Sequence, residues 1–286
     1  MEVHFKQATI IGVGLIGGSL AGIIKSKGLS GCVIGAGRDR ENLETAVRMG
    51  LIDRYYQDAK KAVAGSDLVV LCCPVGKFED VAREIKPYLA DQAIVTDAGS
   101  VKGDLVARLE EIFYLKARYV PAHPIAGSER SGAAAADMKL FNGARCIITP
   151  TKNTDLSALE AVTGLWEKTG AVVHRMDPFE HDRVFSLVSH LPHVAAYAMV
   201  SALAGIDGGE RAITYAAGGF KDFTRIAGSH PDMWRDICLL NGKNILTALD
   251  SYQEALWRFR ELIEKGDGAA LADEFTRARD LRRKLD

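Results

Sequence analysis

The feature that most constrains this chain is a glycine-rich segment that follows directly on an apolar run near the N-terminus. Residues 8–18 read A-T-I-I-G-V-G-L-I-G-G, so that Gly12, Gly14 and Gly17 form the pattern G-x-G-x-x-G before an apolar helical pattern. Strand, glycine turn and helix in this order are typical of dinucleotide-binding folds. A glycine-rich turn in an unrelated α/β protein is the alternative interpretation.

Each glycine of the pattern has a physical role in such a turn. The first allows the tight turn, the second lets the backbone approach a pyrophosphate, and the third lets the helix pack closely on the strand. The helix N-terminus offers unpaired N–H groups and a partial positive charge to phosphates. The residues that we predict to bind the cofactor are Gly12, Gly14, Leu15, Ile16, Gly17, Arg38, Asp39, Cys73 and Pro74.

Length and composition set the broad class of the protein. A chain of 286 residues, 48% hydrophobic and 26% charged, predicts about two globular domains. A net charge of −1 gives no electrostatic reason to expect a nucleic-acid or membrane partner. The longest apolar stretch, 194–205, has about 12 residues and is too short to span a bilayer. Five cysteines without a C-x-x-C pair, and no recognisable signal peptide, predict a cytoplasmic protein.

The first part of the chain alternates between strand-like and helical patterns. Strand-like runs lie at 9–12, 32–36, 68–73, 93–96, 119–122 and 146–149, with 172–174 as a further edge strand. Helical patterns separate them at 43–49, 77–89 and 102–112. This alternation predicts a Rossmann-type, doubly wound, mainly parallel α/β sheet with helices on both faces.

The pattern changes after Asp177-Pro178, where strand-like runs almost disappear. Long helical segments are predicted at 180–204, 231–265 and 269–285. We therefore predict a dinucleotide-binding domain over residues 1–176 and an all-helical domain for substrate binding and dimerisation over residues 177–286. These helices carry apolar residues on more than one side, which predicts a homodimer.

The end of the second predicted strand bears on the choice of cofactor. An acidic residue usually stands there and binds the ribose 2′-hydroxyl of NAD. Here Gly37 occupies about that position and Arg38 follows it, which leaves room and positive charge for a 2′-phosphate. The sequence therefore favours NADP, with NAD possible. In the alternative interpretation Asp39 binds the ribose, and Arg38 and Arg40 are solvated surface charges.

Four further segments combine residue types that are suited to chemistry. They read D-A-G-S-V-K over 97–102, H-P-I-A-G-S-E over 123–129, S-H-L-P-H over 189–193 and F-K-D-F-T-R-I-A over 220–227. Together with the glycine motif, and in this order, they make nearly the whole chain resemble the prephenate/arogenate dehydrogenase family of tyrosine biosynthesis. This resemblance implies oxidative decarboxylation of prephenate or arogenate, with hydride transfer to NAD(P). The residues leave open which of the two substrates is used.

The resemblance also implies roles for individual residues. The catalytic set is His123, which accepts the proton of the substrate 4-hydroxyl, Ser100, which orients this histidine, and His193, a second histidine at the substrate. Arg225 binds a substrate carboxylate, a role suited to its planar fork of donors. The substrate-binding set is Arg225, Glu129, Ser128, Asp222 and Trp234. Within it, Glu129 and Asp222 form an ionic network with the arginine, and Trp234 lines the site.

Alternatives stand beside these roles. His190 is as well explained by structure as by function, and His4, His174, His181 and His230, which have no motif around them, are interpreted as structural or surface residues. His190 and His193 do not predict a metal site, because Pro192 lies between them and further ligands are missing.

Other classes of protein are less favoured. A β-hydroxyacid or imine dehydrogenase of similar fold typically uses a lysine as its acid/base, and a nucleotide-sensing dimer needs no proton acceptor such as His123. Against the wider family, we expect neither a fused mutase domain before the glycine motif nor a regulatory domain after the helices.

Overall fold

The protein is described by a computed structural model that covers residues 4–285. Its backbone divides into two compact units, residues 1–241 and residues 242–286. The first unit contains the strands and the first group of helices, and the second consists of helices alone. Every residue that we predict to take part in the site belongs to the first unit.

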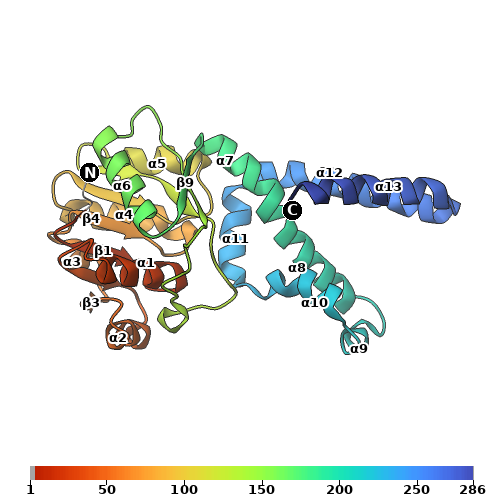
Figure 1. Cartoon of the computed structure of the whole chain (residues 1–286), viewed down its shortest axis with the longest axis horizontal. Coiled ribbons are helices and arrows are strands. Elements are labelled where there is room, and N and C mark those ends of the chain that lie inside the picture. Colours follow the sequence, from red (N-terminus) through yellow and green to blue (C-terminus); the bar gives the residue numbers. More distant parts are fainter. Residues whose placement is uncertain (1–3, 286) are drawn as a thin grey trace. The chain divides into compact units, whose positions relative to one another are not determined.

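A six-stranded parallel sheet forms the centre of the first unit (Figure 1). Its strand order is β3-β2-β1-β4-β5-β6. The strands β1 to β3 are added toward one edge of the sheet, and β4 to β6 are added toward the other edge. This is the doubly wound arrangement of dinucleotide-binding proteins, as the sequence predicts. The strands are β1 (Ala8–Ile11), β2 (Val33–Ala36), β3 (Arg54–Tyr56), β4 (Leu68–Leu71), β5 (Ala93–Asp97) and β6 (Ala117–Val120).

Helices cover both faces of this sheet, because neighbouring strand residues point to opposite sides and both sides are apolar. Ile10 belongs to one hydrophobic core and Ile11 to the other. The first core takes side chains from α1 (Leu15–Ser26), α2 (Arg40–Arg48) and α6 (Leu156–Lys168). The second takes them from α3 (Ala59–Val63), α4 (Phe78–Ile85) and α5 (Gly103–Phe113). The sequence did not predict β3, α3 or α6, all of which have weak or short patterns.

A second, three-stranded sheet departs from the predicted single sheet. It consists of β7 (Ala122–Pro124), β8 (Arg145–Ile148) and β9 (Val172–Arg175), with β7 antiparallel to β8 and β8 parallel to β9. The run 119–122 was expected to be one strand, but Pro121 separates β6 from β7. Proline cannot donate to a strand ladder, and the chain leaves the parallel sheet at this residue. His123 therefore lies inside β7, opposite Ile147, and not just beyond a parallel strand.

One long helical run follows the sheets. Helix α7 (Pro178–Phe185) begins where the Asp177 carboxylate accepts hydrogen bonds from the N–H groups of Phe179 and Glu180, at 2.8 and 3.1 Å. It continues through a π-helical turn (Ser186–His190) into α8 (Leu191–Ala204), as Figure 1 shows. Helices α9 (Gly209–Ile213), α10 (Gly218–Thr224) and α11 (Pro231–Leu240) complete the first unit, with a 3₁₀ turn (Arg225–Gly228) after α10.

By length and composition alone, the 27-residue run Pro178–Ala204 could cross a membrane. It is longer than the apolar stretch predicted from the sequence, because the helix extends into a more polar segment. That segment contains the buried side chains of His181 and Asp182, both of which hydrogen-bond to residues from the sheet region. We therefore interpret the start of this helix as packed on protein.

Packing of α7 against α5, and of α11 against the turn Val75–Lys77, explains why the first compact unit extends to residue 241. The boundary predicted at 176/177 lies inside this unit, and it stays a prediction about domains. The predicted helix 231–265 is interrupted at Asn241, where α11 ends and α12 begins.

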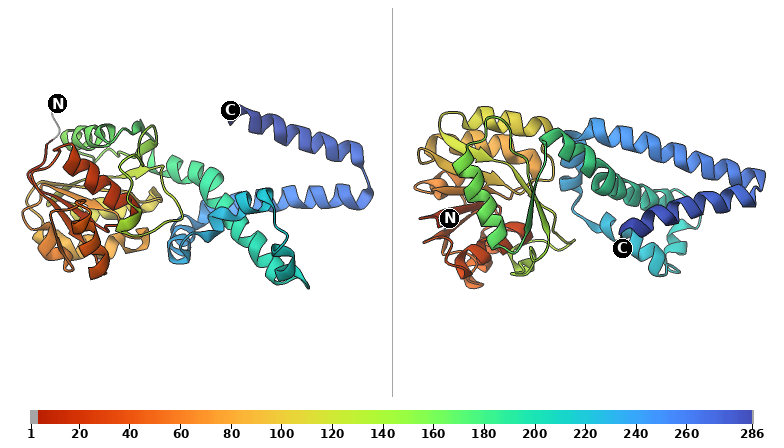
Figure 2. Two further views of the ribbon diagram at one scale, coloured as in Figure 1. Left: turned by 60° about the horizontal axis from the view of Figure 1, so that its bottom comes forward. Right: turned by 45° about the horizontal axis from the view of Figure 1, so that its top comes forward.

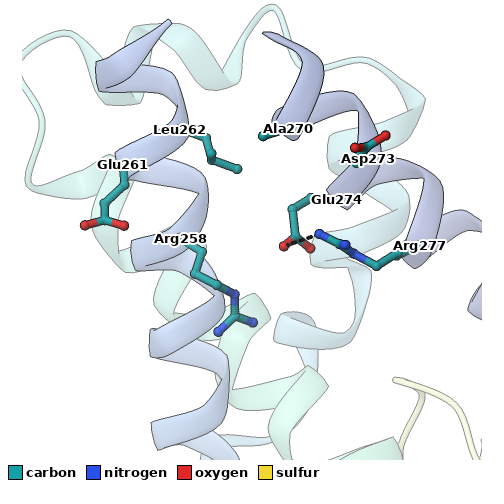
Figure 3. A pocket seen from close by; sticks show the side chains of 7 residues that line it. All are labelled: Arg258, Glu261, Leu262, Ala270, Asp273, Glu274 and Arg277. Atoms are coloured by element: carbon teal, nitrogen blue, oxygen red, sulfur yellow. Dashed lines mark ion pairs between the residues drawn. The ribbon is translucent and has the colours of Figure 1, made fainter. Parts of the chain in front are cut away.

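The second unit is a pair of helices, α12 (Gly242–Lys265) and α13 (Gly268–Arg282), with a final 3₁₀ turn (Arg283–Leu285). Figure 2 shows the two helices running in opposite directions, and Phe259 stacks on Phe275 with ring centroids 5.3 Å apart. A cleft of about 350 Å³ lies between them (Figure 3). Its lining is mostly charged and contains none of the predicted site residues: Arg258, Glu261, Leu262, Ala270, Asp273, Glu274 and Arg277.

Candidate active site

The glycine turn has the geometry that a dinucleotide requires. Gly12 has a φ of +98°, and a Cβ atom there would lie 2.6 Å from the backbone nitrogen of Cys73. A Cβ atom on Gly17 would lie 2.1 Å from the carbonyl oxygen of Gly12. By contrast, a Cβ atom on Gly14 would meet no described atom within 4 Å, so the space beside it is open.

Helix α1 begins directly after Gly14, so its first N–H groups face this open space. The first turn contains Leu15 and Ile16, whose backbone donors have no partner inside the helix. Cys73 and Pro74 follow the end of β4 beside Gly12. These residues fit the pyrophosphate of a dinucleotide, which needs backbone donors and close approach more than it needs side chains.

The charged residues at the end of β2 differ in whether they have hydrogen-bond or ion-pair partners. The Asp39 carboxylate accepts a hydrogen bond from the Asn42 N–H at 3.1 Å and caps α2, and Arg40 pairs with Glu44 at 2.8 Å. In the described part of the chain, the exposed Arg38 guanidinium makes no ion pair. Burial raises the pKa of the Cys73 thiol to about 12, and the charge of Arg38 opposes this rise, so the guanidinium lies near the end of β4.

The chemical end of the site contains three buried side chains in series. His123 Nδ1 lies 2.8 Å from His181 Nε2, and His181 Nδ1 lies 2.8 Å from Asp182 Oδ1. His123 is 9% exposed, His181 0% and Asp182 4%. His181, interpreted from the sequence as a structural or surface residue, is fully buried and contacts the predicted proton acceptor directly.

The start of α5 holds the Asp182 carboxylate in place. Its Oδ1 atom accepts the Lys102 N–H at 2.8 Å, and a Cβ atom on Gly103 would lie 2.6 Å from its Oδ2 atom. The N-terminal end of a helix favours a negative charge. The motif D-A-G-S-V-K and the glycine after it thus shape a place for an aspartate from α7.

A second buried group of charges lies beside the first. Lys102 Nζ pairs with Asp97 Oδ1 at 2.5 Å, and both side chains are almost fully buried. The Gly99 N–H donates to the same oxygen at 2.7 Å, and Tyr119 Oη donates to Asp97 Oδ2 at 2.6 Å. Burial holds the pKa of the Tyr119 hydroxyl well above its usual range. Every atom of the Asp97 carboxylate is therefore satisfied, as a buried charge requires.

Burial also keeps the histidines neutral. It holds the pKa of His123 well below its usual range, and positive charge on His181, Lys102 and His190 lowers it further. Burial lowers the pKa of His181 as well, although the Asp182 carboxylate opposes the shift. A neutral His123 can accept a proton at neutral pH.

The segment S-H-L-P-H lies on the π-helical turn and the start of α8. Such turns are frequent at functional sites, and here one precedes Pro192, which lacks an N–H group. His193 Nδ1 lies 2.9 Å from the Ser189 carbonyl oxygen, and its ring stacks on Trp234 with centroids 3.7 Å apart. Trp234 is buried, and its Nε1 atom has no hydrogen-bond partner among residues 4–285.

His190 points toward the interior. The Asn241 side-chain amide contacts its Nδ1 atom at 3.0 Å, and burial lowers its pKa to about 4. The Ser100 backbone also faces its ring. This packing explains His190 as a support between α11 and the Asp97–Lys102 segment.

Arg225 and Glu129 join the loop after β7 to the turn after α10. Arg225 Nη1 lies 3.0 Å from Glu129 Oε2, and both side chains are exposed. Burial lowers the pKa of His193 and the charge of Arg225 lowers it further, so the two side chains lie near each other. The structure thus brings Arg225 and His193 together with Trp234, and His190 links this group to His123 through mutual electrostatic effects.

Some predicted contacts are not present. In the described chain, Ser100 makes no hydrogen bond to His123, whose Nδ1 atom is engaged by His181. Asp222 makes no ion pair with Arg225 in residues 4–285, and the Ser128 hydroxyl accepts the Arg130 N–H at 3.2 Å. Within the same residues, no three His, Cys, Asp or Glu side chains gather as a metal site.

The fold and the site define a class of protein. A doubly wound sheet with an open glycine turn, next to a helical region that presents histidines and an arginine, is the architecture of a nicotinamide-dinucleotide-dependent dehydrogenase. Residues 20–175 match the family model described as prephenate dehydrogenase, nucleotide-binding domain, and residues 177–277 match the one described as prephenate dehydrogenase, dimerization domain. The chain belongs to the prephenate dehydrogenase family.

Individual relatives agree with this placement. Cyclohexadienyl dehydrogenase of Zymomonas mobilis is 35% identical over 283 residues, which cover 98% of this chain and 96% of the relative. Prephenate dehydrogenase from Aquifex aeolicus, solved in complex with hydroxyphenyl propionate and NAD+, is 38% identical with a TM-score of 0.92 over 100% of both chains. Arogenate dehydrogenase from Synechocystis is 28% identical with a TM-score of 0.80, over 98% of this chain and 100% of that one.

Proposed function

We propose that this protein oxidatively decarboxylates prephenate to 4-hydroxyphenylpyruvate, with arogenate as the alternative substrate. The observation that carries the proposal is the neutral, buried His123, which shares one network with His181 and lies in the same site as His193 and Arg225. The family membership supplies the reaction. The site contains a neutral imidazole and an arginine, the base and the cation that this reaction needs.

The reaction divides into tasks for particular groups. When bound, the nicotinamide accepts a hydride from carbon 4 of the substrate. His123 accepts the proton of the 4-hydroxyl at Nε2, since its Nδ1 atom is engaged by His181. The ring carboxylate leaves as carbon dioxide, its bonding electrons make the ring aromatic, and the oxygen at carbon 4 is retained in the product. Arg225 binds a substrate carboxylate, and His193 and Trp234 line the ring.

For the cofactor, we propose NADP as the favoured dinucleotide and NAD as possible. No carboxylate occupies the Gly37 position, Asp39 already caps α2, and Arg38 is free of ion pairs within the described chain. An unpaired guanidinium at the end of β2 suits a 2′-phosphate. The Aquifex aeolicus relative was solved with NAD+, so cofactor preference has to be measured for this chain.

We also propose that the protein is a cytoplasmic homodimer assembled through its helical region. Residues 177–277 match a dimerization domain, and large apolar side chains on α8 and α12 are exposed in the single chain, among them Met199, Leu246 and Trp257. Helices that are apolar on more than one side usually bury the second side against another subunit. Sedimentation at micromolar concentration should give a dimer, and a monomer would contradict this assembly.

The test of activity is absorbance at 340 nm with each substrate and each cofactor. We expect reduced cofactor to form with prephenate, faster with NADP than with NAD at equal concentration, and carbon dioxide to form in equal amount. A higher kcat/KM for arogenate would assign the alternative substrate. No reduction of either cofactor with either substrate would contradict the proposed function.

A further inference from the structure

We infer that His181 and Asp182 are positioning residues that fix the proton of His123 on Nδ1, so that Nε2 meets the substrate unprotonated. The inference rests on the proposed function for its chemical meaning. The arrangement of protons follows from the structure alone and can be measured without substrate. No motif around His181 points to this role.

An ionised carboxylate such as that of Asp182 can only accept hydrogen bonds. Its Oδ1 atom lies 2.8 Å from His181 Nδ1, so that nitrogen carries the proton. A neutral imidazole has one donor and one acceptor nitrogen, so His181 Nε2 is an acceptor. Its neighbour at 2.8 Å, His123 Nδ1, must therefore donate. This leaves the lone pair of His123 on Nε2.

Several features suit a carboxylate at the position of Asp182. It is nearly buried, yet its Oδ1 atom accepts the Lys102 N–H at 2.8 Å as well as the imidazole proton. It lies at the beginning of α5, where the helix dipole favours an anion. Gly103 leaves space for its other oxygen, because a side chain there would collide with Oδ2. The carboxylate thus has a fixed position and two hydrogen-bonding neighbours at its Oδ1 atom.

The charges that surround the histidines explain why the network suits a transient proton acceptor. Lys102 and His190 face His123 and disfavour its protonation at rest. Asp182 and Asp97 face His181 and favour positive charge on it, while the charge of Lys102 opposes this effect. When Nε2 of His123 takes the substrate proton, the Nδ1–H can move toward His181 Nε2, and the positive charge then approaches Asp182. The number of protons is conserved, and no further reactant is needed.

The stacking around His181 provides a way to separate this role from simple packing. Its ring lies 4.5 Å from the Phe185 ring and 5.0 Å from the His123 ring, measured between centroids. Leucine can fill the space beside these two rings but offers neither an acceptor to His123 nor a donor to Asp182. Glutamine fills it less well but offers an amide oxygen to the Nδ1–H of His123. Packing and positioning therefore predict opposite orders for these two substitutions.

The experiment compares His181→Leu with His181→Gln, and the same pair at exposed His174 of β9 serves as the control. We expect His181→Leu to lower kcat by about 10²- to 10³-fold, and His181→Gln to stay within about tenfold of the wild type. Cofactor affinity should not follow this order, and activities are compared at equal folded fraction. If Leu is as active as Gln, or more active, at equal folded fraction, the positioning role is overturned.

A second measurement needs no substrate and no active variant. Nitrogen NMR of histidine labelled in its ring reports which nitrogen carries the proton, with assignments from single histidine substitutions. In the wild-type protein at pH 7.5, we expect both His123 and His181 to carry the proton on Nδ1 and to be unprotonated at Nε2. A proton on His123 Nε2 would overturn the inference even if the enzyme is active.

Failure of the inference can be told apart from failure of the proposed function. If His123→Asn abolishes turnover while His181→Leu does not change it, the base is correct and the positioning role is wrong. If His123→Asn keeps wild-type turnover on prephenate, His123 is not the proton acceptor, and the proposed function is contradicted at that residue. The nitrogen NMR result still decides the arrangement of protons in that case.

Discussion

The two ends of the site differ in the groups that form them: backbone groups at the cofactor end and side chains at the chemical end. The cofactor end consists of backbone: Gly12, Gly14 and Gly17 remove side chains so that N–H groups and a helix terminus face open space. The chemical end consists of buried side chains, among them His123, His181 and Asp182, that hold one another at hydrogen-bonding distance. The cofactor end is defined by the absence of side chains. The chemical end is defined by buried polar and charged side chains that need hydrogen-bonding partners.

This difference determines how each end can fail. At the cofactor end an added methyl group is enough, because a Cβ atom on Gly17 would lie 2.1 Å from a carbonyl oxygen. At the chemical end, shape can be preserved and function lost, because a single proton in the wrong place removes the base. Substitutions that keep volume and change hydrogen bonding should therefore separate the two ends.

The largest effect should come from His123→Asn, which keeps polarity and removes the imidazole. We expect turnover with prephenate to fall by about 10²- to 10⁴-fold, the usual contribution of a general base. Cofactor binding, measured by fluorescence titration, should stay within about threefold of the wild type, since the glycine turn is untouched. His174→Asn, at an exposed histidine of β9, is the matched control.

The pH profile of the wild type sharpens the same prediction. Because burial lowers the pKa of His123 well below 6.5, kcat/KM should stay level from neutral pH down to the weakly acidic range and fall only below it. An acidic limb centred above pH 7, or more than about half of wild-type turnover in His123→Asn, would contradict the assignment.

The contrast also explains what the sequence can and cannot predict. The cofactor end lies within a few consecutive residues, and its pattern depends on local backbone geometry, so Gly12 to Gly17 could be recognised directly. His181 and His123 are separated by 58 positions, and neither the hydrogen bond between them nor the burial of both is visible in any local pattern. Here the family resemblance gave His123, but only the fold could give its partner.

The errors at element level have equally physical causes. Residues 119–122 have the composition of one strand, and only the missing N–H of Pro121 divides them between two sheets. Helix α6 was missed, although Asp155 caps it by accepting the Ala158 N–H at 2.8 Å. Its apolar residues alone did not mark it, whereas the long helices after Asp177 carried a clear signal.

The second-largest expected effect is on substrate affinity, at the chemical end of the site. Arg225→Ala should raise KM for prephenate by about 10- to 100-fold and leave kcat within a few-fold, because a charged hydrogen bond common to ground and transition states is lost. Its exposed ion pair with Glu129 contributes little to stability, so the melting temperature should hardly change. Arg211→Ala, on α9, is the control, and an unchanged KM in Arg225→Ala would remove the assigned role.

At the cofactor end, the one side chain expected to matter is Arg38. Arg38→Ala should weaken NADP binding by about 1.5–3 kcal/mol, the scale of a hydrogen bond to a charged group, and leave NAD nearly unchanged. Arg40→Ala is matched in charge, but its guanidinium already pairs with Glu44, so it should affect neither cofactor. Equal losses for NADP and NAD in Arg38→Ala would mean that Arg38 does not bind the 2′-phosphate.

The smallest expected effect is a change in stability with pH. It comes from the buried histidines of the chemical end, and in the described chain the cofactor end has no such group. The pKa of His190 falls from 6.5 to about 4 in the folded chain, mainly through burial, and those of His123 and His181 fall too. Below about pH 6.5 the unfolded chain therefore binds more protons, and stability decreases as pH falls. For His190 alone, the free energy of unfolding should drop by about 2 kcal/mol between pH 7.5 and 5.

Urea unfolding at several pH values and one protein concentration measures this decrease. His190→Gln should lower stability at pH 7.5, because the contact with Asn241 changes, yet its stability should depend less on pH than that of the wild type. Carboxylates with lowered pKa values, such as Asp53 beside Lys25, contribute only at more acidic pH, so they do not confuse the comparison. Equal pH dependence in both proteins would show that the pKa of His190 is the same in the folded and the unfolded chain, and that its environment is more polar than its contacts indicate.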